Sequence, residues 1–350
     1  MSGKLRIVLI ALMVLGAVSG CDSIAYYTQA VSGQAALLWR RQPIERLLAD
    51  PALEPALRHK LLVIQQATDY AGEQLGLSAE GSYDSYVELQ RRHLVWNVFA
   101  APTFSTQPVS WCFPVAGCVD YRGYFSEAAA RRYAADLQAQ GFDVFVGGVD
   151  AYSTLGWFND PVPSTVIQRP DHQLAALIFH ELAHQRIYVA DDTSFNESFA
   201  SFVSLEGLRH WLDQQDQEEL YLQSIEDLLE QQRFIDFVLD YREQFAALYA
   251  RDMSADAMRE QKRQLQAHMR ASWQASLGAG ADRYYGWFQG PLNNAQLSTV
   301  GSYYTWVPAF DALFRQSGED FEVFYQAVSD LATLSPDVRQ RRLMALMSAD

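Results

Sequence analysis

The residues of this chain that are most clearly suited to catalysis are the five at 180–184, which read H-E-L-A-H. If this segment is helical, His180 and His184 lie one turn apart on the same face and can bind one zinc ion together. Glu181 would then lie beside a water on that ion, where it could take a proton from the water. The pattern therefore predicts metal-assisted hydrolysis of a peptide bond, provided that the surrounding sequence can build such a site.

The segment around this motif has the spacing of a helix. Five apolar residues recur three or four positions apart: Leu174, Leu177, Ile178, Leu182 and Ile187. No Pro or Gly interrupts residues 171–190, and Asp171 follows Pro170 at a position where it could cap the first turn. We predict a helix that begins at Asp171 and ends near Val189.

A catalytic zinc site needs a third protein ligand and an open fourth position. The best candidate is Glu197, in the stretch F-N-E-S-F-A, because a turn at 191–194 and a second helix would bring its first turn back to His184. Alternatively, Ser194 and Glu197 form a capping box, in which Glu197 only satisfies the helix start. Glu206 is a rival ligand about two and a half turns further on.

The neighbouring acidic residues have lesser roles open to them. Asp191 and Asp192 are weaker candidates for the third ligand. One of them could instead hydrogen-bond a ligand histidine or cap the second helix.

Several stretches together carry a family resemblance. The two motifs resemble those of the glutamate-ligand zinc peptidases, and specifically of the bacterial putative aminopeptidase lipoproteins. The stretches W-C-F-P-V-A-G-C at 111–118, Y-R-G-Y-F at 121–125 and A-Y-S-T-L-G-W-F at 151–158 also look like that family. The resemblance covers most of the mature chain. It implies that His180, His184 and Glu197 bind one Zn²⁺ and that Glu181 is the catalytic base.

The first residues predict export and lipid attachment. Lys4 and Arg6 precede an apolar segment at 7–18 that is too short to span a membrane stably. The following V-S-G-C looks like a lipobox ending at Cys21, although an ordinary secretory signal with an incidental cysteine would read similarly. Asp22 resembles a signal for retention in the inner membrane. We therefore expect a cell-envelope lipoprotein that faces the periplasm and is held by acyl chains.

Cysteine count and charge agree with an exported globular protein. Without Cys21, the pair Cys112 and Cys118 remains, and an oxidising compartment favours a disulfide between them over two reduced thiols. Hydrophobic residues make up 49% of the 350, enough for a large core, and the formal net charge is −15. An acidic protein is a poor partner for nucleic acid or an anionic membrane surface.

The chain divides into four predicted regions. They are a signal peptide at 1–20, an N-terminal helical region at 21–90, a zincin-like catalytic core at 91–212 and a C-terminal helical region at 213–350. In the core, strands at 93–99 and 144–146 flank a helix at 126–140 that Gly141 ends. We predict an α+β fold, mainly helical, with a small mixed or antiparallel sheet beside the metal helix. The aromatic stripe at 234–248 is interpreted as core.

Two further groups of residues are candidates for substrate contact. Residues 152–157 have strand composition and could form the edge along which a peptide binds, through Tyr152, Ser153, Thr154 and Gly156. Gly156 would let a peptide backbone approach closely, although a bulge in an ordinary edge strand is the alternative.

The second group would bind polar parts of the substrate or stabilise the oxyanion, the negatively charged oxygen that forms when water attacks the peptide carbonyl. Tyr304, ahead of Tyr303, is the preferred oxyanion donor. Asn294 and Arg122 could bind backbone or carboxylate groups of a peptide.

Taken together, these residues predict a lipid-anchored zinc metallopeptidase that acts on peptides or proteins, with aminopeptidase activity preferred. A zinc endopeptidase of envelope proteins and a non-catalytic zinc-binding envelope lipoprotein are the alternatives.

Overall fold

The computed structural model describes residues 24–79, 81–113, 117–151, 154, 158–276, 284–301 and 305–348. A helix over residues 24–40 precedes the other elements. The further helices are α2 (Ile44–Leu48), α3 (Pro55–Gln74), α4 (Glu127–Ala139), η1 (Ser164–Val166), α5 (Asp171–Arg186), α6 (Thr193–Asp213), α7 (Glu218–Tyr249), α8 (Ala255–Ser276), α9 (Tyr285–Phe288), α10 (Asn294–Leu297), α11 (Val307–Gln316), α12 (Phe321–Ala332) and α13 (Pro336–Met347). The strands are β1 (Gln42–Pro43), β2 (Ser85–Val87), β3 (Val95–Pro102), β4 (Trp111–Phe113), β5 (Gly117–Val119), β6 (Arg122–Tyr124), β7 (Phe142–Val149) and β8 (Val162–Pro163).

The main sheet is small and antiparallel, with the strand order β6-β3-β7. Helix α4 packs against β3 and β7 through small and aliphatic side chains, Ala130, Ala134 and Leu137. Ser126 caps this helix, and Gly141 follows it in the left-handed region at φ +90°, a conformation that glycine adopts without strain. The predicted strands and the predicted helix between them are therefore confirmed.

The remaining strands form two smaller sheets. The order β1-β2-β8 contains an antiparallel and a parallel pair, and β4 and β5 form a hairpin. The predicted combination of a mainly helical chain with small antiparallel and mixed sheets is confirmed.

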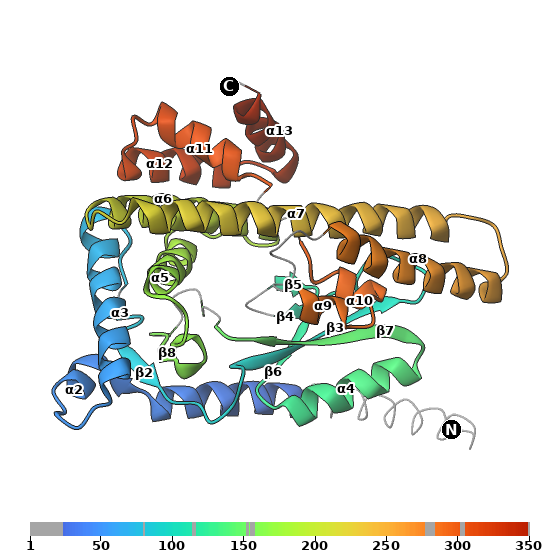
Figure 1. Ribbon diagram of the computed structural model, residues 1–350, viewed down its shortest axis with the longest axis horizontal. Helices are drawn as coiled ribbons and strands as arrows, with labels where there is room; N and C mark the ends of the chain where they lie inside the picture. The colour runs from blue at the N-terminus through green and yellow to red at the C-terminus, as the bar shows by residue number, and fades with distance from the viewer. Residues whose placement is uncertain are drawn as a thin grey trace, which may run out of the picture.

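Helices α5 and α6 pack against each other within the largest core, where α5 lies beneath α6 in Figure 1. Aromatic side chains of α6 face those of the C-terminal helices: Phe195, Phe199 and Phe202 meet Phe310, Phe314 and Phe324. The same core also contains Ile64 of α3 and Ile178 of α5. Residues from three of the predicted regions therefore share one core, and the division of the chain into domains stays a prediction.

The long helix α7 runs on from α6 in Figure 1 and builds a second core with α8 and α9. Phe234, Val238, Tyr241 and Phe245 are buried there, so the aromatic stripe is core as predicted. A buried ion pair between Lys262 of α8 and Asp143 of β7, with nitrogen and oxygen 2.5 Å apart, joins this helical region to the main sheet.

Candidate metal centre

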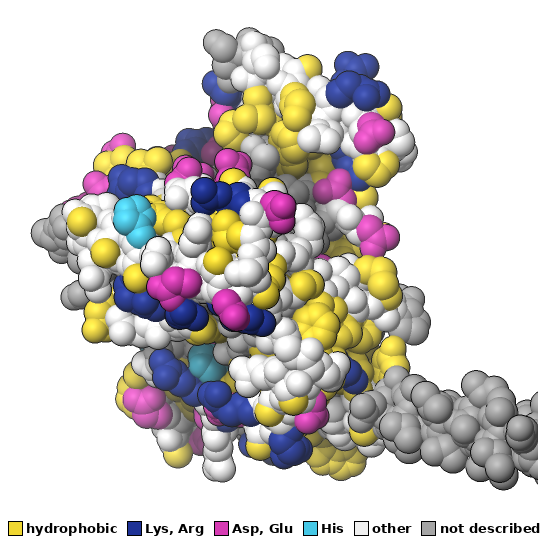
Figure 2. All heavy atoms as spheres, turned by 90° about the vertical axis from the view of Figure 1, so that its right-hand side faces the viewer, with side chains coloured by type: hydrophobic (Ala, Val, Ile, Leu, Met, Phe, Trp, Pro, Cys, Tyr) yellow, Lys and Arg dark blue, Asp and Glu magenta, His cyan; other side chains and the backbone are white. Residues whose placement is uncertain are grey.

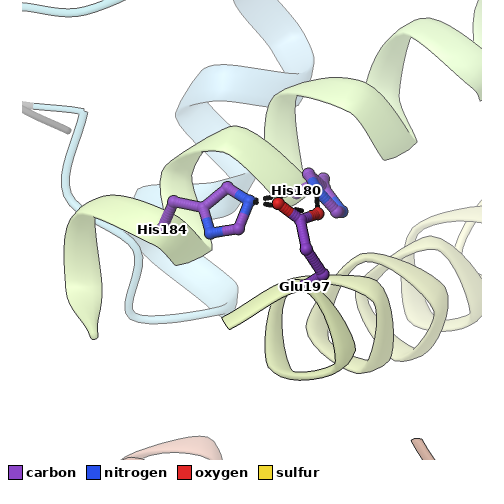
Figure 3. Close-up of side chains that lie close together, drawn as sticks. All are labelled: His180, His184 and Glu197. Carbon is purple, nitrogen blue, oxygen red and sulfur yellow. Dashed lines mark hydrogen bonds and ion pairs between the residues drawn. The ribbon is translucent and has the colours of Figure 1, made fainter. Parts of the chain in front are cut away.

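Three side chains from α5 and α6 point at one another (Figure 3). The Nε2 atoms of His180 and His184 lie 3.1 Å apart, and Oε2 of Glu197 lies 3.4 Å from the first and 3.7 Å from the second. A tetrahedral zinc with ligands at about 2.0–2.2 Å places neighbouring ligand atoms roughly 3.3–3.6 Å apart. The triangle of ligand atoms therefore has the dimensions of one face of a tetrahedral site.

The donor set also indicates the class of metal. Two imidazole nitrogens and one carboxylate oxygen suit zinc and related transition metals, whereas calcium and magnesium prefer oxygen ligands. Within the described parts of the chain, His180, His184 and Glu197 are the group whose potential ligand atoms all lie within 4.8 Å of one another.

Helix α5 places the two histidines one turn apart, as the sequence predicts. Its first turn differs from the prediction, because Pro170 is the N-cap and Asp171 lies inside the helix. The carboxylate of Asp171 instead pairs with Lys60 at 2.7 Å and His59 at 2.6 Å, which ties α5 to α3. The helix ends at Arg186, three residues before the predicted end, because Ile187 is already extended.

Helix α6 begins earlier than the sequence suggests. Asp192 is its N-cap and accepts a hydrogen bond from the backbone N–H of Phe195. Glu197 is consequently the fifth residue of α6, in its second turn and not in its first. The capping-box interpretation of Ser194 and Glu197 is wrong, since Asp192 already provides the cap.

A side chain that sequence reasoning missed holds the loop between the helices. Asn196 is 2% exposed, accepts a hydrogen bond from the N–H of Val189 at 2.8 Å and donates one to the carbonyl of Val189 at 2.7 Å. Because Asn196 immediately precedes Glu197, this clamp sets how the first turns of α6 face the end of α5. The F-N-E sequence contains the signal, since a buried Asn must satisfy its amide.

The start of α6 is also held from the far end of the chain. Arg339 of α13 is 3% exposed and bonds Oδ2 of Asp192 through Nε at 2.9 Å and Nη2 at 2.6 Å. Its Nη1 donates to the carbonyl of Leu334 at 2.8 Å. The cap of α6 is therefore fixed by a residue 147 positions downstream, a distance that no local pattern reveals.

The alternative candidates for the third ligand, Glu206 and Asp191, bond to other residues. Glu206 pairs with Arg209 and with His210, whose Nε2 lies 3.0 Å away. Burial would raise the pKa of Glu206, but the hydrogen bonds from His210 and Arg209 outweigh it and lower the pKa to about 2. Asp191 accepts a hydrogen bond from the backbone N–H of Cys118 at 3.4 Å.

Electrostatics keep the carboxylate of Glu197 ionised. Burial would raise the pKa of Glu197, but the hydrogen bonds with His180 and His184 lower it to about 2. For His180, burial favours the neutral ring, yet its hydrogen bond with Glu197 and the charge of Glu181 outweigh this, so its pKa is raised. The carboxylate of Glu197 is therefore ionised at neutral pH and available to a cation.

The second ring nitrogen of His184 is distinctive within the described part of the chain. Nδ1 of His184 is buried without a hydrogen-bond partner among the described residues. Asp191 and Asp192, which the sequence offered as supports for a ligand histidine, bond Cys118, Phe195 and Arg339 instead.

Glu181 borders a small apolar cavity. Its aliphatic lining comes from α3, α5 and the segment through β8 and η1, and includes Ile64, Leu177, Ile178, Val162 and Val166. Ala151, just beyond β7, also lines it. The cavity volume of about 20 Å³ is room for about one water or a small apolar group. The structure thus places a narrow apolar space beside the predicted base.

Two tyrosines that sequence reasoning did not select lie within electrostatic reach of Glu197. Burial and the carboxylate of Glu197 raise the pKa of Tyr121, a residue that is 40% exposed. Burial, Asp191 and Glu197 likewise raise the pKa of Tyr188. Tyr121 packs against Phe99 of β3, with ring centroids 5.8 Å apart. Its only sequence signal is its place in the Y-R-G-Y-F stretch.

Cys112 and Cys118 form the predicted disulfide, which closes the β4–β5 hairpin. This hairpin touches the loop between the metal helices, through the bond from Cys118 to Asp191. Asp191 lies in the left-handed region at φ +62°. The hairpin therefore supports the turn that returns the chain toward Glu197.

The remaining predicted site residues are distributed differently. Arg122 is held between the rings of Tyr26 and Tyr133, 4.1 Å and 4.4 Å from their centroids. Asn294 is 1% exposed, and its amide bonds the carbonyls of Pro102 and Thr103, both at 3.0 Å. The structure does not bring either residue to the metal centre, and for Asn294 a buried structural role replaces the predicted substrate contact.

The other predicted substrate residues are only partly covered. Thr154 donates hydrogen bonds to the carboxylate of Asp160 through its backbone N–H, at 2.7 Å, and through its hydroxyl. These are local contacts between residues six positions apart. Tyr152, Ser153, Gly156, Tyr303, Tyr304 and Cys21 lie outside the described residues. Their roles stay predictions.

The fold and the site define a mainly helical protein with a potential metal-binding group on two packed central helices. The chain belongs to the putative aminopeptidase family, whose model matches residues 25–343. This match supports a peptidase function. No curated protein and no solved structure shows a significant match to the chain.

Proposed function

We propose that the protein is a zinc metallopeptidase, anchored by lipid in the cell envelope and facing the periplasm, with aminopeptidase activity preferred. The observation that carries the proposal is the triangle of ligand atoms on His180, His184 and Glu197, with sides of 3.1, 3.4 and 3.7 Å. The zincin-like description of the core belongs to the same proposal.

The roles of the residues follow from their positions. When bound, zinc would lower the pKa of a water and polarise the scissile carbonyl. Glu181, next to His180 on α5, accepts the proton of the attacking water and passes it to the leaving amine. Tyr121 is proposed to donate a hydrogen bond to the developing oxyanion, in competition with Tyr304 and Tyr303. His180, His184 and Glu197 would hold the ion.

The apolar cavity beside Glu181 bears on the substrate. The cavity of about 20 Å³ is lined mainly by apolar side chains, together with Tyr83 and Glu181, and has room for a small apolar group. We therefore propose peptides or proteins with a small aliphatic residue next to the cleaved bond as substrates. A zinc endopeptidase of envelope proteins is the second candidate. A panel of matched peptides with free and blocked N-termini separates the two, because an aminopeptidase requires the free amine.

Anchoring is proposed through a lipid on Cys21, and Asp22 favours retention in the inner membrane. Among the helices of the described chain, none combines the length and the apolar character that crossing a membrane requires.

The decisive experiment replaces Glu181 by Gln in the full-length protein. We expect the Glu181→Gln protein to contain one zinc per chain by elemental analysis and to lose peptide hydrolysis. Glu219→Gln, at an exposed position of α7, is the control and should retain both. Hydrolysis by metal-loaded Glu181→Gln protein would disprove the mechanism. Absence of hydrolysis by the metal-loaded wild type over the whole panel would favour the non-catalytic zinc lipoprotein.

A further inference from the structure

The helix at residues 24–40 uses one face to pack on the protein. The Tyr26 ring stacks on Phe113, with centroids 5.5 Å apart. The side chain of Gln29 donates to the carbonyl of Gly123 at 3.3 Å. Leu37, on the same side, is 5% exposed. These contacts fix the rotation of the helix about its axis.

The opposite face of this helix is apolar and exposed. Ile24 is 68% exposed, Tyr27 43%, Val31 68% and Trp39 91%. At about 100° per residue Ile24, Val31 and Trp39 lie opposite Tyr26, and Tyr27 lies at the edge of this face, where its ring contacts that of Tyr26 at 5.5 Å between centroids. A surface helix normally carries polar residues on the face that points away from the protein. Here the outward face also carries large exposed apolar side chains, so it is expected to have a partner.

We propose that the outer face of this helix, formed by Ile24, Tyr27, Val31 and Trp39, lies in the interface of the lipid bilayer. The inference rests on the lipid anchor of the proposed function and not on its peptidase activity. Cys21 is three residues before Ile24, and three residues of extended chain span at most about 11 Å. Acyl chains on Cys21 would therefore hold the start of the helix at the bilayer surface.

The residue types and the charge also fit a bilayer. Trp and Tyr favour the membrane interface, where the ring is in an apolar layer and its polar atom reaches water. The chain has a net charge of −15, and on the face drawn in Figure 2 acidic and basic side chains are interspersed. Charge attraction to anionic lipids is therefore weak, and apolar burial must supply the contact. In Figure 1 the helix, in dark blue, runs along the lower edge of the molecule.

Lipid-dependent quenching tests this contact directly. The full-length lipoprotein is reconstituted in vesicles of phosphatidylethanolamine and phosphatidylglycerol, with a single Val31→Cys change that carries a fluorophore. This thiol is selectively labelled if Cys21 is acylated, because Cys112 and Cys118 are bonded to each other. The matched control is Leu222→Cys in α7, where the native side chain is 55% exposed. Nitroxide lipids with the nitroxide at the headgroup serve as quenchers.

We expect several-fold stronger quenching at position 31 than at position 222. Equal quenching at the two positions, or none at position 31 in lipid-anchored protein, would overturn the inference. Crosslinking of position 31 to another protein without quenching would also overturn it, in favour of a protein partner. The mass of the N-terminal peptide reports the lipid on Cys21 separately. Absence of that lipid would refute the anchor and this inference together, whereas loss of hydrolysis alone concerns only the peptidase proposal.

Discussion

Removing the clamp on the metal loop should weaken the metal site and the fold together. Asn196→Ala deletes the two hydrogen bonds to the backbone of Val189. The N–H of Val189 then loses its partner, whereas its carbonyl keeps the bond from the N–H of Asp192 at 3.3 Å. The change does not touch Glu197 itself. It therefore tests whether the position of the ligand depends on the loop that precedes it.

The size of the effect follows from the contacts. Each hydrogen bond contributes about 1 kcal/mol net, and each buried polar group left unpaired costs about 1–3 kcal/mol. Val189 is only partly buried, so water can recover part of the cost. We expect the free energy of unfolding to fall by roughly 2–4 kcal/mol. The dissociation constant for zinc should rise by roughly tenfold, the lower limit for residues that position metal ligands.

Asn293→Ala is the matched control. Asn293 also makes two hydrogen bonds to backbone, accepting from Gln296 N–H and donating to the Val144 carbonyl, but it caps α10. Its replacement should lower stability by a similar amount and leave zinc affinity unchanged. Chemical denaturation of the metal-free proteins gives stability, and competition with a chelating dye gives zinc affinity. Zinc bound equally tightly by Asn196→Ala and the wild type, or equally weakened by both changes, would refute the reasoning.

Three further outcomes are expected. Tyr121→Phe should lower kcat by about 100-fold without loss of zinc; if the loss appears in Tyr304→Phe instead, the sequence-based choice is right and the role of Tyr121 is refuted. Because the pKa of Glu206 is lowered to about 2, its carboxylate stabilises the fold above the unfolded value of about 4.3, and this contribution disappears as the pH falls toward 2. Glu206→Gln should thus cost roughly 2 kcal/mol at neutral pH, with the difference from wild type shrinking in acid denaturation curves; a constant difference would contradict the assignment. Lys262→Met leaves Asp143 buried without its partner and should destabilise the protein by about 3 kcal/mol in urea titrations, whereas an unchanged midpoint would show that the pair contributes nothing net.

The parts of the site that sequence predicted are those with local causes. His180 and His184 share a face because a helix repeats every 3.6 residues, and Glu197 returns to them across a short loop. The helix between Ser126 and Gly141 was predictable for the same reason, because its cap and its stop are encoded in the residues themselves.

The parts that sequence missed depend on distant partners. Asp192 became the cap of α6 together with Arg339, which lies 147 residues downstream. Asp171 does not cap α5, because its carboxylate accepts a hydrogen bond from Lys60 of α3. Asn294 looked like a substrate contact, but its burial against β3 is a tertiary property. Capping preference is a weak local energy, and an ion pair formed by folding overrides it.

The burial of the two metal helices on nearly all sides determines where this protein can move. Helix α6 buries 13 of its 21 residues, and α5 is enclosed by α3 and α6. Displacing either helix would open a close-packed interior, so motions that admit substrate must come from the segments around them. Backbone amides of α5 and α6 should consequently exchange with deuterium only during global unfolding. The potential metal-binding side chains of His180, His184 and Glu197 are therefore held by two rigid helices.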